Sequence, residues 1–163
     1  VVISWAYRGT MRYLSEDFQL KILKEVRDAN TEKFSICTAY TSQSMIEKMA
    51  KDAKFKDKLE FLLIGDPLSL GFEGKRKAIS KALKKGSSDR VFFANLGVLN
   101  TSTSRWSPII HSKIYVGYDK GEKPIWAFIG SPNFSESGMG LHRESLIHVT
   151  EQKTLTGIDK HIE

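Results

Sequence analysis

The sequence has almost no cysteine and no long apolar segment. Cys37 is the only cysteine among the 163 residues, which excludes a disulfide framework and a cysteine-rich zinc site. No apolar run approaches the roughly 18 residues that a membrane-spanning helix needs. The first residues also lack the basic lead and the apolar stretch of a signal peptide. We therefore expect a protein of the reducing cytoplasm that has no membrane partner.

Positive charge exceeds negative charge in this chain. Lysine and arginine total 25, aspartate and glutamate total 19, and the net charge is +6. A basic chain favours polyanionic partners such as nucleic acids, although a lysine-rich solvated helix produces the same balance. The length fits one domain. Because the chain starts at Val1 and stops within an expected helix, we expect residues 1–163 to be a single domain from a longer chain.

Hydrophobic periodicity predicts strands and helices that alternate in the first half of the chain, followed by a hairpin. Ser15 is the expected N-cap of the first helix, and Gly86 closes the third. The alternation predicts an α/β fold with a largely parallel sheet covered by helices. The expected elements are helices over 15–30, 42–54, 75–85 and 155–162, and strands over 34–40, 59–64, 91–99, 109–118, 124–130 and 143–150.

Three clusters of polar residues in the last third of the chain are candidates for a functional site. His111 and Lys113 are two apart in an expected strand, so both side chains should lie on one face. An imidazole beside an ammonium suggests a phosphate site, although chance often produces this pair. Ser131 and Asn133 offer uncharged donors in a glycine-containing turn, which is also common as a simple connection. Glu144 opens the last strand, where a surface carboxylate is the plainer interpretation.

Taken together, these clusters form a more specific pattern. The order His111-x-Lys113, Gly130-Ser131-x-Asn133 and then Glu144 resembles the phospholipase D superfamily of phosphodiesterases. The turn over residues 128–138 is similar to that of metal-independent type II restriction endonucleases. The resemblance implies an α-β-α sandwich around a mixed, largely parallel sheet.

The resemblance also implies a mechanism. His111 attacks phosphorus and forms a phosphohistidine, and a second histidine protonates the leaving oxygen. Lys113 and Asn133 hold the non-bridging oxygens, Ser131 adds a hydrogen bond, and Glu144 fixes the tautomer of His111. No metal or other cofactor is needed. Because the chain has one such motif and the mechanism needs two histidines, the family's pattern implies a homodimer with a composite active site.

Charge and family point to DNA as the substrate, with RNA left open, and to a separate domain that recognises the DNA sequence. Two alternatives remain. One is a lipid phosphodiesterase, although such enzymes carry two motifs in a longer chain. The other is a nucleic-acid-binding module that retains the fold without catalysis. Nucleic-acid contacts are expected from basic and aromatic side chains near the motif and on the basic helix, namely Lys75, Arg76, Arg105 and Trp106.

Overall fold

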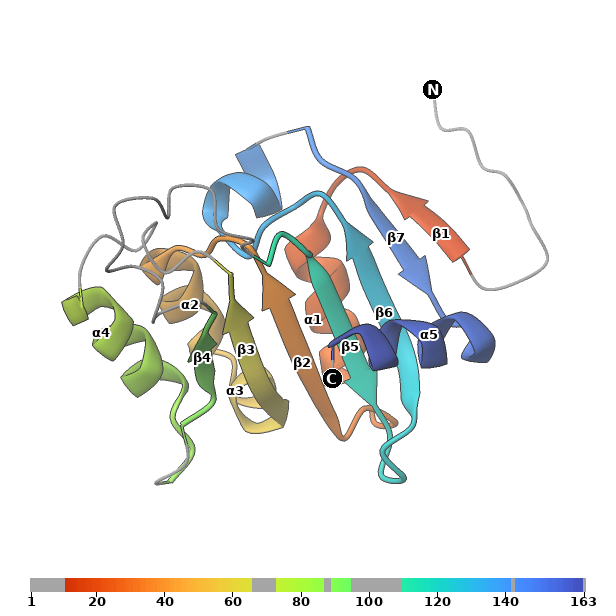
Figure 1. The fold of residues 1–163 in the computed structure, drawn as a ribbon, viewed down its shortest axis with the longest axis horizontal. Coiled ribbons are helices and arrows are strands. Elements are labelled where there is room, and N and C mark those ends of the chain that lie inside the picture. Colours follow the sequence, from red (N-terminus) through yellow and green to blue (C-terminus); the bar gives the residue numbers. More distant parts are fainter. Residues whose placement is uncertain (1–10, 66–72, 87–88, 95–109, 142, 163) are drawn as a thin grey trace.

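The computed structural model describes residues 11–65, 73–86, 89–94, 110–141 and 143–162. Within these ranges, seven strands form one sheet in the order β1-β7-β6-β5-β2-β3-β4 (Figure 1). The elements are, in chain order, β1 (Met11–Leu14), α1 (Phe18–Arg27), β2 (Lys33–Thr38), α2 (Gln43–Ala50), α3 (Ala53–Lys58), β3 (Leu59–Ile64), α4 (Glu73–Leu83), β4 (Val91–Phe93), β5 (Ile114–Tyr118), β6 (Pro124–Gly130), the π-helix η4 (Ser137–Leu141), β7 (Leu146–Val149) and α5 (Gln152–Ile162).

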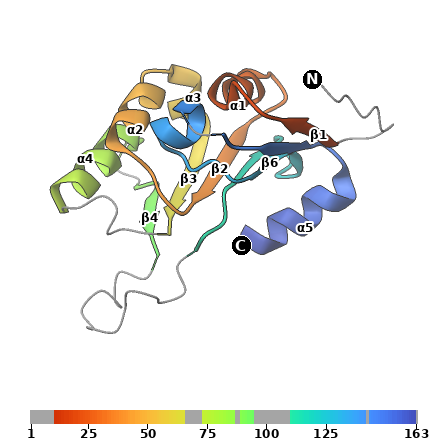
Figure 2. The same cartoon turned by 90° about the horizontal axis from the view of Figure 1, so that it is seen from above.

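Helices enclose the sheet from both sides. Figure 2 shows α1, α2, α3 and α4 on one side of the sheet and α5 on the other. The expected α/β fold with three layers is therefore confirmed. None of the helices in the described ranges combines the length and the apolar character needed to cross a bilayer.

The sheet is mixed, as expected, but it is not largely parallel. The pairs β2-β3 and β3-β4 are parallel. The other four pairs of described strands, from β1 across to β2, are antiparallel. The alternation of strands and helices in the first half of the chain does produce the parallel pairs. The second half is an antiparallel meander of β5, β6 and β7, in which a short turn joins β5 to β6 and a longer connection that contains η4 joins β6 to β7.

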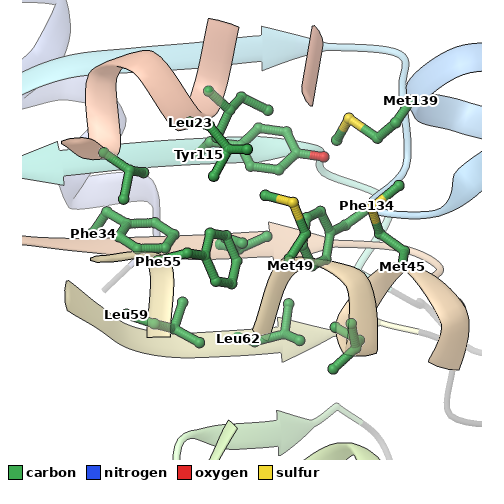
Figure 3. Close-up of a cluster of buried hydrophobic side chains, with 14 of the residues drawn as sticks. Leu23, Phe34, Met45, Met49, Phe55, Leu59, Leu62, Tyr115, Phe134 and Met139 are labelled. Atoms are coloured by element: carbon green, nitrogen blue, oxygen red, sulfur yellow. The ribbon is translucent and has the colours of Figure 1, made fainter. Parts of the chain in front are cut away.

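The core between the sheet and α1, α2 and α3 is rich in aromatic side chains (Figure 3). Phe34 of β2 lies 4.9 Å from Phe55 of α3, measured between ring centroids, and Phe55 stacks on Phe134 at 5.9 Å. Phe134 belongs to the turn after β6, so this packing fixes that turn to the helical layer. On the other face, Leu155 and Ile158 of α5 pack in a smaller apolar cluster against β5, β6 and β7.

All the expected helices have different boundaries in the structure. The expected helix over 75–85 is α4 (Glu73–Leu83), and the expected helix over 155–162 begins earlier, at Gln152. The first expected helix begins at Phe18, and its N-cap is Asp17 in a left-handed conformation (φ 54°), so the assignment of Ser15 as the cap was wrong. The expected helix over 42–54 is two helices, α2 and α3. The second one starts anew because the Asp52 carboxylate caps it, accepting a hydrogen bond from the Phe55 N–H at 3.0 Å.

The strand boundaries differ at the end of the sheet that carries the polar residues. The expected strand over 109–118 begins only at Ile114, where its pairing with Cys37 of β2 begins. The expected strand over 143–150 shortens to Leu146–Val149. Part of the expected strand over 91–99 lies outside the described residues. The sequence also did not predict β1 or η4, which are short elements without a clear periodicity.

Candidate active site

Four segments that carry polar side chains meet at one end of the sheet. They are the loop after β2, the segment before β5, the turn after β6 and the segment before β7. The strands β5 and β7 run antiparallel to β2 and β6, so starts and ends of strands meet at the same edge (Figure 1). This topology brings His111, Lys113, Asn133 and Glu144 to one region of the molecule.

His111 and Lys113 are in direct contact just before β5. The Lys113 Nζ lies 2.9 Å from Nδ1 and 3.0 Å from Nε2 of His111, and it donates a hydrogen bond to the His111 backbone oxygen at 2.8 Å. A neutral imidazole has one nitrogen that can accept a hydrogen bond, so at most one ring contact is such a bond. A hydrogen bond donated by the ammonium needs a ring nitrogen with a free lone pair, and the same lone pair is what a nucleophilic imidazole uses.

The two side chains are neighbours for a reason other than the expected one. They were predicted to share a face of a strand, but both residues precede β5. The pairing between β2 and β5 ends at Cys37 and Ile114, so the chain is free to leave the regular pleat at Lys113. A folded-back lysine side chain, which bonds the carbonyl two residues earlier, brings the ammonium to the ring.

Burial of Lys113 shapes the electrostatics of the site. Only 6% of Lys113 is exposed, whereas His111 is exposed. Burial lowers the pKa of the Lys113 ammonium below its usual value, and the negative charge of Glu144 opposes that decrease. The site thus contains a charge that is poorly hydrated, and such a charge gains from a bound anion.

The Asn133 amide is oriented by the loop after β2. Its Oδ1 accepts a hydrogen bond from the Tyr40 backbone N–H at 3.1 Å, which leaves the NH₂ group available to a ligand. Two threonines join the same loop to the turn after β6. Thr38 Oγ1 accepts from the Phe134 N–H at 3.0 Å, and Thr41 Oγ1 donates to the Phe134 oxygen at 2.6 Å. These bonds hold Asn133 in a fixed position relative to β2.

Ser131 is exposed, and its hydroxyl is held by the segment before β7. Its Oγ accepts a hydrogen bond from the Ser145 N–H at 3.1 Å, so the hydroxyl proton remains free to donate. Gly130, which precedes Ser131, approaches the Ser145 backbone closely. A Cβ on Gly130 would lie 2.0 Å from the Ser145 backbone oxygen. Gly130 is therefore needed for packing between strands.

Glu144 is half-buried and lies near Lys113, where its charge affects the pKa of the ammonium. Among the described residues, no hydrogen bond joins Glu144 to His111. The carboxylate also raises the pKa of the buried Tyr115, after the larger effect of burial. The Tyr115 hydroxyl donates to the Pro132 oxygen at 3.2 Å, so it supports the turn that carries Ser131 and Asn133.

A pocket of about 990 Å³ opens beside these side chains. His111, Lys113, Ser131 and Asn133 supply polar groups to its lining. Residues of α5 and isoleucines of the sheet also line it, and sequence reasoning did not assign these residues to the site. The complete lining is His111, Ser112, Lys113, Ile114, Ile129, Gly130, Ser131, Asn133, Thr154, Gly157 and Ile158.

Sequence reasoning also missed Tyr40. Its ring stands edge-on to His111 with the centroids 6.4 Å apart, and 37% of the residue is exposed. Its position as the last residue of the expected strand over 34–40 was the only available signal. The α5 residues gave no signal, because a sequence does not indicate which part of a sheet a terminal helix covers.

The structure does not test the predicted nucleic-acid contacts. Arg105 and Trp106 lie outside the described residues. Lys75 and Arg76 lie in α4, and their side chains are outside the described part of the structure. Figure 1 shows α4 at the β4 edge of the sheet, with β2 and β3 between it and β5.

No metal centre is evident in the parts of the chain that are described. There, no group of three or more histidine, cysteine, aspartate or glutamate side chains is arranged to hold a metal ion.

Known structures share this fold. The chain superposes on Nuc from Salmonella typhimurium, a phospholipase D family member, with a TM-score of 0.58 and 13% identity, covering 93% of this chain and 91% of that one. NucT from Helicobacter pylori superposes with a TM-score of 0.57 and 12% identity, covering 93% of this chain and 91% of that one. Polyphosphate kinase from Porphyromonas gingivalis superposes with a TM-score of 0.61 and 10% identity, covering 93% of this chain and 25% of that one. The fold is therefore that of phospholipase D-like proteins.

The sequence identifies the group within this class. The sequence model of the family described as NgoFVII restriction endonuclease N-terminal PLD domain matches residues 16–163, and the chain belongs to that family. A search of curated protein sequences finds no match.

Proposed function

We propose that this protein is a phosphodiesterase that cleaves DNA without a metal, through a phosphohistidine intermediate, as the catalytic domain of a restriction endonuclease. The observation that carries the proposal is the contact between His111 and the buried Lys113 on the wall of an open pocket. A neutral imidazole is a nucleophile, and a poorly hydrated ammonium beside it attracts the phosphate that it attacks. Membership of a family of restriction endonuclease domains supports this reaction class.

The proposed roles follow the positions of the side chains. His111 attacks phosphorus, while Lys113 and the free NH₂ group of Asn133 stabilise the charge that develops on the non-bridging oxygens. Ser131 donates the proton that its contact with Ser145 leaves free. Glu144 keeps Lys113 charged, and it orients His111 when the substrate-bound site tightens, as catalytic hydrogen bonds often do.

The leaving oxygen needs a proton from a second histidine. Among the described side chains that line the pocket, His111 is the only histidine. His148 is half-buried on the other face of the sheet, stacked on Phe128 with the ring centroids 4.5 Å apart. The second imidazole in this proposal is therefore His111 of another copy, in a homodimer whose two-fold axis passes near the site.

The substrate assignment depends on charge and on family. A net charge of +6 favours a polyanion, and restriction endonucleases act on DNA. Residues 1–163 act in this proposal as a single domain of a longer chain, and a separate domain recognises the DNA sequence.

The test is cleavage of duplex DNA in excess EDTA by the wild type and by His111→Ala. We expect the wild type to retain its activity, because both catalytic groups belong to the protein. We expect His111→Ala to lose turnover while its circular dichroism spectrum stays unchanged, because no other group can form the covalent intermediate. Wild-type reactions with labelled DNA should be quenched in two ways. Quenching in alkali should trap the labelled DNA on the protein as the phosphohistidine, and quenching at low pH should break that bond and release the DNA.

Two results would contradict the proposal. Activity that vanishes in EDTA and returns with Mg²⁺ would exclude the metal-free mechanism. A wild type that binds DNA and cleaves neither DNA nor a small diester would identify a non-catalytic nucleic-acid-binding module instead.

A further inference from the structure

The helix α5 forms a wall of the pocket although it contributes no charged group to the pocket lining. Thr154, Gly157 and Ile158 line the pocket from α5, and the polar groups of His111, Lys113, Ser131 and Asn133 line it from other segments. Leu155 and Ile158 anchor the helix in the apolar cluster on this face of the sheet. The Tyr118 hydroxyl, which donates to Asp159 Oδ1 at 2.7 Å, adds a polar anchor. The position of this wall relative to His111 is therefore fixed by packing.

Gly157 is an unusual residue for this helix. Glycine destabilises a helix interior relative to alanine, because its backbone loses more conformational freedom on folding. Two common structural reasons for a glycine do not apply here. Gly157 does not have a positive φ, and a Cβ built on it meets no atom within 4 Å. The fold would accept a side chain at this position, and that side chain would occupy the pocket.

Apart from Thr154, the α5 residues that line the pocket have no polar side chain, and Ile114, Ile129 and Ile158 add apolar surface to the lining. A phosphate needs only the polar groups of His111, Lys113, Ser131 and Asn133. A sugar or a base next to the phosphate has apolar surface to bury, and the apolar part of the lining provides a matching surface.

We infer that the wall of α5 around Gly157 is the subsite for the nucleoside next to the scissile phosphate, and that Gly157 provides the clearance through which a polynucleotide strand enters. The inference rests on the proposed function, which places the phosphate at His111 and Lys113. Two features favour a polynucleotide as the occupant: the wall is continuous with the phosphate site, and the chain carries a net charge of +6. Gly157 is thus a specificity-determining position for polymeric substrates.

The test compares two substrates in Gly157→Ala and Gly157→Leu of the full chain. One substrate is duplex DNA, and the other is methyl 4-nitrophenyl phosphate, a diester without a nucleoside. For Gly157→Leu we expect kcat/KM on DNA to fall by about a hundredfold, the scale of a misplaced reacting group. On the small diester we expect a change within roughly twofold, because no group that touches the phosphate is altered. Gly157→Ala should show an intermediate loss on DNA and a melting temperature no lower than that of the wild type.

Gly140→Leu is the matched control. A Cβ on Gly140 also meets no atom within 4 Å, but this residue lines a different pocket, beside α1. We expect its kcat/KM to match that of the wild type on both substrates.

The outcomes separate the two proposals. An equal loss on both substrates, or no loss on DNA in Gly157→Leu, would overturn the nucleoside subsite while the proposed function stands. If Gly157→Leu sediments as a monomer where the wild type is a dimer, the wall is a contact between copies and the inference also fails. A wild type that hydrolyses neither substrate overturns the proposed function itself.

Discussion

Lys113 combines burial with a lack of ordinary charge partners. Its ammonium bonds the His111 carbonyl and contacts the His111 ring, and among the described carboxylates none forms a salt bridge with it. An isolated buried charge is costly unless a partner compensates it. A bound phosphate diester would supply that compensation, so the same feature that destabilises the free protein strengthens binding of the substrate.

His148 is a half-buried titratable group, and it affects stability rather than the site. Burial lowers its pKa to about 4, and the positive charges of Arg12 and Lys24 add to that effect. Its Nε2 lies 3.8 Å from Glu25 Oε1, a carboxylate whose own pKa is raised by burial. Because the folded protein disfavours the protonated ring, the unfolded chain takes up a proton more readily as the pH falls below about 6.5.

We therefore predict that stability falls between about pH 6.5 and pH 4, and that His148→Phe reduces this dependence. The wild type should lose roughly 2 kcal/mol relative to the variant between pH 7 and pH 5, as the linkage relation gives for this difference in pKa. Urea unfolding at several pH values measures this loss. Equal slopes in both proteins would mean that the His148 ring is protonated without cost in the folded state.

The elements of the fold were easier to predict than their ends. The buried faces of α1 and α2 followed from helical periodicity, and β3 and β6 have the expected bounds. The start of β5 could not be predicted, because alternation continues to residue 109 while its partner strand ends at Cys37–Thr38. The antiparallel pairing of β5 could not be predicted either, since it depends on β5 inserting next to β2 and not next to β4.

For the candidate site, too, the sequence predicted the residues but not their contacts. Its polar residues could be named from their order in the sequence, but their contacts depend on how the ends of β2, β5, β6 and β7 meet. The bond from the Tyr40 N–H to Asn133 and the wall of α5 both require the three-dimensional arrangement.

The end of β3 supports the segment that carries His111. Gly65 donates its N–H to the Thr38 oxygen at 2.8 Å, and a Cβ on Gly65 would lie 1.9 Å from the Ile110 backbone oxygen. We predict that Gly65→Ala displaces residues 110–113 and lowers kcat on methyl 4-nitrophenyl phosphate by about ten- to a hundredfold, the cost of misplacing a reacting group. Steady-state kinetics and a melting curve measure the two effects.

Gly140→Ala serves as the control, since its new methyl group meets nothing within 4 Å. If Gly65→Ala loses stability and keeps the wild-type kcat, then Ile110 moves without carrying His111 along, and this link between β3 and the site is wrong.

At the scale of the whole molecule, the proposed dimer predicts the behaviour of mixtures. A composite site needs His111 from both copies, so a heterodimer of wild type and His111→Ala has no complete site. After unfolding and refolding an equal mixture, we expect about a quarter of the activity of the same total amount of wild type, because only wild-type homodimers are competent. Independent sites would give about half. Sedimentation of the same samples checks that dimers formed.

Retention of half the activity, or a fully active monomer, would exclude the shared site. The proton donor would then have to come from the same chain, from His142 or His148. His142 lies outside the described residues, and His148 is a poor candidate because its ring is stacked on Phe128 on the other face of the sheet.

The bonds that hold the site together also determine when it forms. The Tyr40 N–H and Asn133 are 93 residues apart, and Thr38 and the Phe134 N–H are 96 apart. Contacts between such distant residues form slowly, because a long loop must close before they add stability. During synthesis on the ribosome, the nascent chain cannot assemble the candidate site until the turn after β6 has emerged and docked against β2. A partly made or prematurely released chain therefore lacks the assembled site, and under the proposed function it would gain nuclease activity only when the sheet is nearly complete.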